Sequence, residues 1–235
     1  MAEDAKVTTL HDPIRVAALD DHPVILRGLR ALAGEHPDKV VLTRAAARVK
    51  ELMADGLDAD VVLLDLRVPD HPHPEETVRT LTRRGIKVVL HTAQVQPVPI
   101  RVAMAAGAVG LVLKSDDEDA VLEAIELAAA GEYAVTGELA YLLANDPKLV
   151  ADLAPREVEV LRLLAQGVPK KAIGRHMTGK VITLATVNTY FSRIARKYAA
   201  LHRPVGDALG AVREAQRDGH LDLAADEEDW IRRLN

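Results

Sequence analysis

The sequence predicts an α/β fold, in which a doubly wound (βα)5 domain with five parallel strands precedes a small all-α domain with a helix-turn-helix. In the first half of the chain, short aliphatic runs alternate with helix-length amphipathic stretches, which is typical of buried parallel strands and their crossover helices. The second half changes to helical periodicity and an excess of basic residues. With 235 residues, 49% of them hydrophobic, the chain can bury one large core and one smaller core.

The first domain is expected to span residues 12–130 and to contain five βα units. Strands are predicted near 14–19, 40–45, 61–65, 88–92 and 109–114, and helices near 23–35, 48–54, 74–84, 97–106 and 118–130. Gly131 is expected to end the last of these helices. Residues 131–152 then read as a linker that contains a short helix near 138–143.

Polar side chains follow four of the predicted strands. Asp20 and Asp21 follow the first strand, Asp65 the third, Thr92 the fourth and Lys114 the fifth. Because ligands bind where the carboxyl ends of parallel strands converge, we expect these five side chains to meet. The three carboxylates are suitable ligands for Mg²⁺. Asp65 would then attack phosphorus and form an aspartyl phosphate, while Thr92 and Lys114 would bind phosphoryl oxygens.

Simpler roles exist for each of these residues. An aspartate at a strand end is often a helix cap or a turn former, but that explanation fits single positions better than the whole set. His22, beside the acid pair, is expected to be a turn residue facing solvent rather than a catalytic group. His71 and His73 lie in a proline-rich loop, and two histidines without a third ligand favour a stiff solvent loop over a metal site.

Charge is distributed unevenly along the chain. Residues 1–150 carry 16 basic and 24 acidic side chains, residues 151–221 carry 12 and 6, and residues 222–235 carry 2 and 5. Between Val160 and Gly206 there are nine basic residues and no acidic residue. The alternative is a solvated basic face, but the absence of acids over this stretch favours an interface for nucleic acid.

The second domain is expected at residues 153–221, with helices near 155–165, 169–177, 184–198 and 205–218. In the third helix, four apolar residues recur at helical spacing and should face the core: Val187, Phe191, Ile194 and Tyr198. The residues left facing outward are expected to read bases in a major groove: Thr186, Asn188, Thr189, Ser192, Arg193 and Arg196. Other basic residues are better placed for phosphates: Lys170, Lys171, Lys180, Lys197 and Arg203.

These residues carry a resemblance to a known family. The set at the strand tips, with Pro69 four residues after Asp65, resembles the receiver domain of two-component response regulators. The segment LAPREVEVLRLLAQGVPKKAIGRHM, with ATVNTYFSRIARKY after it, resembles the LuxR-type helix-turn-helix of the NarL/FixJ branch. Together the two motifs cover about residues 14–221.

The resemblance implies a DNA-binding response regulator. A histidine kinase would phosphorylate Asp65 in the presence of Mg²⁺, held by Asp20, Asp21, Asp65 and the backbone carbonyl of Arg67, and transcription would respond. The last helix, with Leu209, Val212 and Gln216 on one side, would form a homodimer contact on double-stranded DNA.

The sequence also departs from the family pattern. Leu111 stands three positions before Lys114, where such receivers usually have an aromatic switch residue, and residues 1–130 contain no Phe, Tyr or Trp. Ser115 replaces the proline that often follows the lysine. The turn at 178–185 is about three residues longer than usual, and Asn188 replaces a frequent lysine.

Two alternatives follow from these departures. One is an atypical regulator with the same DNA-binding output, switched by a small molecule or a partner protein. The other is a magnesium phosphohydrolase, which usually needs a second acid two residues after its nucleophile, where this chain has Arg67. We therefore expect a regulator rather than an enzyme.

Composition narrows the class further. The chain has no cysteine, which excludes disulfides, thiolate chemistry and Cys-ligated zinc. Residues 1–10 lack the apolar core of a signal peptide, and no apolar run is long enough to span a membrane. A soluble cytoplasmic protein is expected. The acidic tail at 222–235, which contains Trp230, is interpreted as a frayed or weakly docked terminus, or as a shield for the basic helix.

Overall fold

The computed structural model describes residues 12–69, 73–93, 95–135, 137–146 and 149–221. The chain divides into two compact units, Met1–Ala93 with Ala103–Gly137, and Gln94–Val102 with Glu138–Asn235. The domain limits at 130 and 153 and the 131–152 linker stay predictions. The division places one boundary inside the predicted linker, and it assigns residues 94–102 of the predicted first domain to the second unit. The expectations for residues 1–10, for His71 and for the 222–235 tail lie outside the described residues.

The first unit is built on a parallel sheet. Its strands are β1 (Ile14–Leu19), β2 (Val40–Ala46), β3 (Val61–Leu64), β4 (Lys87–Thr92), β5 (Gly110–Leu113) and β6 (Ala134–Val135). They lie in the order β2-β1-β3-β4-β5-β6, and every neighbouring pair is parallel. The five predicted strands are therefore confirmed, in a doubly wound sheet.

The sixth strand corrects the prediction of five. β6 has two residues, too few to give a strand pattern, and it falls in the predicted linker. It pairs with β5 at Gly110, where a side chain would bring a Cβ within 2.6 Å of the carbonyl oxygen of Ala134. Only glycine allows the two backbones to approach so closely.

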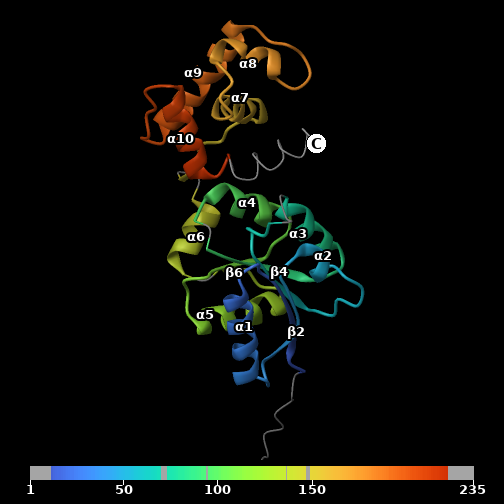
Figure 1. Cartoon of the computed structure of the whole chain (residues 1–235). Coiled ribbons are helices and arrows are strands. Elements are labelled where there is room, and N and C mark those ends of the chain that lie inside the picture. The colour runs from blue at the N-terminus through green and yellow to red at the C-terminus, as the bar shows by residue number, and fades with distance from the viewer. Residues whose placement is uncertain (1–11, 70–72, 94, 136, 147–148, 222–235) are drawn as a thin grey trace, which may run out of the picture. The chain divides into compact units, whose positions relative to one another are not determined.

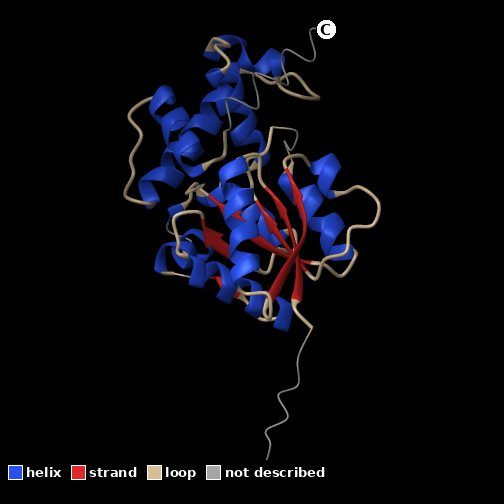
Figure 2. Cartoon of the chain, turned by 60° about the horizontal axis from the view of Figure 1, so that its bottom comes forward, coloured by secondary structure: helices blue, strands red, loops and turns tan. Residues whose placement is uncertain are grey.

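Helices cover both faces of the sheet (Figures 1 and 2). They are α1 (Pro23–Glu35), α2 (Val49–Leu52), α3 (Pro74–Arg83) and α5 (Glu118–Ala130), whereas α4 (Pro97–Ala105) is divided between the two units. α1 and α5 share a core with alternate residues of the strands, and α2 and α3 lie on the other side (Figure 1). α5 begins where the Asp117 carboxylate accepts a hydrogen bond from the Ala120 N–H and ends at Gly131, as predicted. α2 is shorter than the predicted 48–54 helix.

The second unit is helical and includes the first part of α4. Its helices are α6 (Glu138–Asn145), α7 (Pro155–Ala165), α8 (Lys170–His176), α9 (Leu184–Ala200) and α10 (Ala208–Asp218). The apolar face predicted for the third helix of this domain is confirmed, because Val187, Phe191, Ile194 and Tyr198 of α9 are all buried. Pro155 begins α7, and the Glu157 side chain accepts a hydrogen bond from the Ala154 N–H ahead of the helix.

No helix in the part of the chain that the structure describes is long and apolar enough to cross a membrane.

Candidate functional site

Four polar residues extend one face of the sheet at the carboxyl ends of the strands. Alternate strand residues on this face belong to the core shared with α1 and α5: Ala18, Leu63, Val89 and Val112. Two positions after each of them along the chain come Asp20, Asp65, His91 and Lys114. Because side chains alternate between the faces of a strand, these four groups lie on one face and at one edge.

The two carboxylates are held close together by the backbone. The Asp65 N–H donates to the carbonyl oxygen of Leu19, which precedes Asp20, at an N···O distance of 2.9 Å. Asp20 and Asp65 are 1% and 3% exposed, so both acids need nearby partners. One oxygen of Asp65, Oδ1, also accepts a hydrogen bond from the Arg67 N–H at 3.2 Å.

Lys114 is the cation that these acids share. Its Nζ lies 2.7 Å from Asp20 Oδ2 and 2.6 Å from Asp65 Oδ2, with a side chain that is only 9% exposed. Burial by itself lowers the pKa of the Lys114 ammonium, but the hydrogen bonds to Asp20 and Asp65 outweigh burial, and the pKa is raised. Lys114 is therefore a fixed positive charge beside Asp65.

Thr92 is placed next to Lys114 by the same sheet edge. It is fully buried at the end of β4, and its carbonyl oxygen accepts a hydrogen bond from the Lys114 N–H at 3.0 Å. The structure thus brings together the side chains of Asp20, Asp65 and Lys114 and places the Thr92 backbone beside Lys114, whereas the roles predicted for these residues stay predictions.

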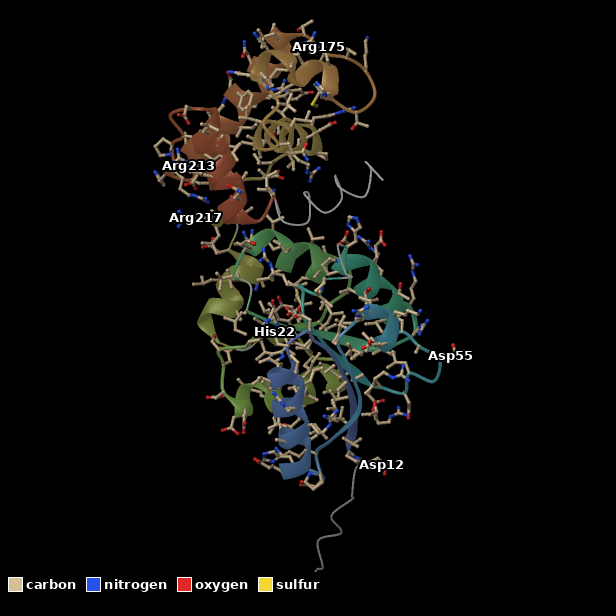
Figure 3. The ribbon with its side chains drawn as sticks, in the orientation of Figure 1. Asp12, His22, Asp55, Arg175, Arg213 and Arg217 are labelled. Carbon is tan, nitrogen blue, oxygen red and sulfur yellow. The ribbon has the colours of Figure 1, made fainter. Side chains whose placement is uncertain are left out.

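Asp21 and His22 complete the rim. His22 Nδ1 lies 2.8 Å from Asp21 Oδ1 and 3.1 Å from Asp20 Oδ1, and the His22 N–H donates to Asp20 Oδ1. The His22 side chain is 65% exposed, at the start of α1 (Figure 3). The His22 side chain faces solvent, as expected. Its contacts with Asp20 and Asp21 were not expected from a turn residue.

The acids suit a divalent cation. Ligand atoms of Asp20, Asp21, His22 and Asp65 all lie within 4.8 Å of one another, the one such cluster among the residues described. Asp20 Oδ2 and Asp21 Oδ1 each have one partner, the Lys114 ammonium and the His22 ring nitrogen, so both oxygens keep lone pairs for a ligand. Three carboxylates and one ammonium leave a formal charge of −2, which a divalent cation would balance. Carboxylate oxygens are the ligands that Mg²⁺ prefers.

His91 is a buried histidine at the same sheet edge, and it was not predicted to belong to the site. It is 6% exposed, and burial together with the charge of Lys114 lowers the pKa of its imidazole, so the ring is uncharged. The signal was present in the sequence, because a histidine that continues an aliphatic run is an anomaly in a buried strand. His73, by contrast, is exposed and lies 3.6 Å from Glu75.

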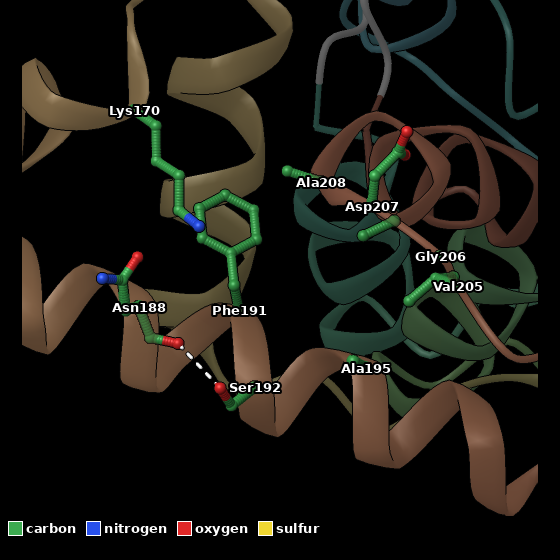
Figure 4. A pocket seen from close by; sticks show the side chains of 10 residues that line it. Lys170, Asn188, Phe191, Ser192, Ala195, Val205, Gly206, Asp207 and Ala208 are labelled. Carbon is green, nitrogen blue, oxygen red and sulfur yellow. Dashed lines mark hydrogen bonds between the residues drawn. The ribbon is translucent and has the colours of Figure 1, made fainter.

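A second candidate site is the outward face of α9. Five of the predicted base-reading residues are exposed on it: Asn188, Thr189, Ser192, Arg193 and Arg196. The Thr189 hydroxyl donates to the Ala185 carbonyl oxygen, and the Ser192 hydroxyl to that of Asn188 (Figure 4). Thr186 differs, because its N–H and hydroxyl both contact the hydroxyl of Thr183, the residue that caps the helix.

The basic residues around α9 divide into two groups. Lys171 and Arg175 are exposed on α8, and Lys170 Nζ lies 4.7 Å from the centre of the Phe191 ring at the edge of a hollow of about 330 Å³ between α9 and the start of α10 (Figures 3 and 4). Lys197 Nζ instead lies 2.7 Å from buried Glu157 Oε2 and donates to the Asp152 carbonyl oxygen.

Arg203 also has a structural role. Its guanidinium lies over the buried Tyr198 ring, 5.4 Å from the ring centre, and contacts Glu214, Asp218 and the Leu149 carbonyl oxygen. Burial is the largest influence on its pKa and lowers it, but the two carboxylates outweigh it and raise the pKa. Arg203 thus holds α9, α10 and the segment before α7 together. That use of a basic residue cannot be told from a phosphate contact by charge alone.

Comparisons with known proteins agree with both sites. Residues 16–126 match the model of the response regulator receiver domain, and residues 151–205 match that of bacterial regulatory proteins of the luxR family. The nitrate/nitrite response regulator protein NarL of Escherichia coli (strain K12) is 30% identical over 197 residues, which cover 79% of this chain and 89% of NarL. The transcriptional regulatory protein LiaR of Bacillus subtilis (strain 168) is 28% identical, covering 78% of this chain and 90% of LiaR.

Among solved structures, the complex of the response regulator RcsB with DNA has the same fold. It matches with a TM-score of 0.62 and 21% identity, over 87% of this chain and 98% of the RcsB chain.

Proposed function

The chain belongs to the response regulators of the NarL/FixJ branch, DNA-binding regulators of transcription, and from this we propose that a histidine kinase phosphorylates Asp65 to control its binding to DNA. The observation that carries the proposal is the buried contact of Lys114 with Asp65 at 2.6 Å, beside a second acid and a buried threonine. A DNA-binding regulator of this kind would work in the cytoplasm.

The chemistry starts at the Asp65 carboxylate. One of its oxygens attacks the phosphorus of a phosphohistidine, a P–O bond forms, and the bond from phosphorus to the histidine nitrogen breaks. The Arg67 N–H on Oδ1 and the Lys114 ammonium on Oδ2 keep the Asp65 side chain oriented. After transfer, Lys114 and Thr92 would hold the phosphoryl oxygens, and the fixed charge of Lys114 offsets the added negative charge.

We assign Asp20, Asp21 and Asp65, with the carbonyl of Arg67, as the ligands that would hold Mg²⁺. When bound, this cation would neutralise charge on the phosphoryl group during transfer. His22 is a poorer ligand for Mg²⁺ because it offers nitrogen rather than oxygen, and it would stay paired with Asp21 at the rim.

On the output side, α9 is the proposed reading helix. Asn188, Thr189, Ser192, Arg193 and Arg196 are proposed to contact bases, with Lys170, Lys171 and Lys180 on phosphates. Thr186 and Lys197 also belonged to the predicted interface. We infer that both residues stabilise the domain instead of contacting DNA. Thr186 hydrogen-bonds to the residue that caps α9, and the Lys197 ammonium pairs with Glu157.

Two copies would bind together. Leu209 on α10 is 59% exposed and is kept in the proposed homodimer contact, whereas Val212, predicted on the same face, is buried in the core of the second unit and cannot contribute to it.

A second candidate keeps the DNA-binding output but replaces phosphorylation by a partner protein or small molecule. Leu111 favours it, because this residue occupies the usual position of the aromatic switch and is fully buried. No ring is present there to move between a buried and an exposed position. A magnesium phosphohydrolase is not favoured, because Arg67 holds the place of the second acid and its side chain is exposed.

Intact-mass measurement distinguishes these candidates. The chain is incubated with acetyl phosphate and Mg²⁺, and a gain of one phosphoryl group is expected in the wild type and not in Asp65→Asn. Asp55→Asn is the matched control, because Asp55 is an exposed acid outside the cluster, and it should label like the wild type. Equal labelling of Asp65→Asn would overturn the assignment, and no labelling of any protein would favour the second candidate.

A further inference from the structure

Two large apolar side chains are exposed where α9 begins. Val181 is 63% exposed and Leu184 is 47% exposed. Within residues 151–221, all of which are described, Leu209 on α10 is the other large hydrophobic with comparable exposure. Scattered exposed apolar residues are normal, but two of these three lie three positions apart, in the α8–α9 loop and at the first residue of α9.

The loop that carries Val181 is anchored on both sides. Arg156 Nη1 donates to the Thr178 carbonyl oxygen at 2.6 Å, and the Thr178 N–H donates to Glu159 Oε1 at 2.5 Å. Four residues later, the Ile182 N–H donates to the Gly174 carbonyl oxygen at 3.0 Å. These bonds fix the backbone before and after Val181, so its exposure follows from the anchored loop.

Leu184 is fixed in a similar way. The Thr183 hydroxyl caps α9 by accepting the Thr186 N–H at 3.2 Å, which makes Leu184 the first residue of the helix. In a helix-turn-helix, the N-terminal residues of the second helix are those that reach base edges in the major groove. Leu184 and the adjoining loop therefore lie at the end of α9 that is expected to enter the groove.

The chemistry of this end suits one feature of DNA. Apolar side chains contribute to readout in the major groove by contact with the C5 methyl group of thymine. The neighbours of the two apolar residues are basic, since Lys180 precedes Val181 and both Lys171 and Arg175 are exposed on α8. No acidic residue lies between Val160 and Gly206, so this stretch would not repel an anionic occupant such as DNA.

We propose that Val181 and Leu184 read thymine methyl groups at the edge of the binding site, and that the longer α8–α9 loop exists to present the first of them. This inference rests on the proposed base reading by α9 and adds a preference for thymine at the edge of the binding site.

The test replaces thymine by deoxyuridine, which removes only the methyl group. A preferred duplex is first selected from a random-sequence library with the full chain, and each thymine in it is then replaced in turn. At one or two positions, wild-type affinity should fall about three- to fivefold, the expected effect of one buried methyl group. Leu184→Ala should bind the thymine duplex about three- to fivefold more weakly than the wild type does. Its affinity should not change further when deoxyuridine replaces the thymine that Leu184 contacts.

Arg193→Ala provides the contrast, because it should lose affinity but keep the sensitivity to deoxyuridine. If the wild type does not distinguish the selected duplex from a scrambled one, base reading by α9 itself fails. If it does distinguish them but ignores every deoxyuridine, the methyl-reading inference alone is overturned. A loss in Leu184→Ala that is equal on thymine and deoxyuridine duplexes also overturns it. Val181→Ser, in an exposed loop position, repeats the comparison without touching the helix.

Discussion

At the residue scale, the arrangement of charge around Asp65 explains why this aspartate is suited to accept a phosphoryl group. Asp20 and Asp65 are buried next to each other, and their repulsion is offset by one ammonium, that of Lys114. Lys114 thus pairs with both carboxylates and places a hydrogen-bond donor where the phosphoryl oxygens would arrive.

His91 gives a pH dependence that belongs to the same scale. Its pKa in the folded protein lies below the ordinary value of 6.5, because burial and the Lys114 ammonium disfavour a charged ring. As the pH falls below 6.5, His91 takes up a proton in the unfolded chain before it does so in the folded chain. The free energy of unfolding therefore falls as the pH is lowered through about 6.5, and the penalty is absent above it.

Urea titrations followed by circular dichroism at pH 7.5 and pH 5.5 measure this effect. The loss of stability between the two pH values should be smaller in His91→Leu than in the wild type. Some loss should remain, because burial also lowers the pKa of His220. Equal losses in the two proteins would mean that His91 is not held uncharged by its surroundings.

At the element scale, Gly174 of α8 controls how the long α8–α9 loop folds back. A Cβ at this position would overlap the carbonyl oxygen of Ile182, a residue that packs against the core of the second unit. Gly174→Ala is therefore expected to destabilise the protein by about 1–3 kcal/mol, as overpacking usually does. The measurement is the midpoint of thermal unfolding.

Gly28 is the matched control for this prediction. It lies inside α1, and a Cβ there would have no neighbour within 4 Å. Gly28→Ala should be neutral or stabilising by up to about 1 kcal/mol, because alanine has the higher helix propensity. If the two variants unfold alike, the close approach of Gly174 and Ile182 has no energetic consequence.

Most elements could be predicted because their patterns are long enough to be read. The aliphatic runs before Asp20, Asp65, Thr92 and Lys114 identified the strands of the site and the edge where they meet. The α9 core face was predicted from its helical spacing. β6 could not be predicted, because two residues carry no periodicity and its pairing depends on Gly110.

The site was less completely predictable than the fold. The meeting of Asp20, Asp65 and Lys114 could be predicted because each follows a strand of one parallel sheet, whereas the partners of Lys197 and Arg203 come from other helices. In the sequence, a basic residue that pairs with Glu157 or Asp218 looks the same as one that binds a phosphate. Only the three-dimensional contacts separate the two uses.

At the scale of the whole molecule, charge separates the two functions. The acidic first part gathers carboxylates at one edge of the sheet, and the basic helical part gathers lysines and arginines around α9. This separation follows from composition and was visible in the sequence. Leu111 is buried in a receiver without aromatic residues before position 131, so in the proposed mechanism a change at Asp65 would reach the output through packing rather than through an aromatic side chain.

The central claim is that a phosphoryl group on Asp65 controls binding to DNA. Fluorescence anisotropy of the full chain on its selected duplex, with and without acetyl phosphate and Mg²⁺, tests it most directly, with Asp65→Asn in parallel. Affinity of the wild type should rise by about 5- to 150-fold on phosphorylation, the usual range of such coupling, and should fall as salt rises. Asp65→Asn should keep the lower affinity in both conditions. Equal affinity of the wild type with and without acetyl phosphate, or an equal gain in Asp65→Asn, would contradict the account.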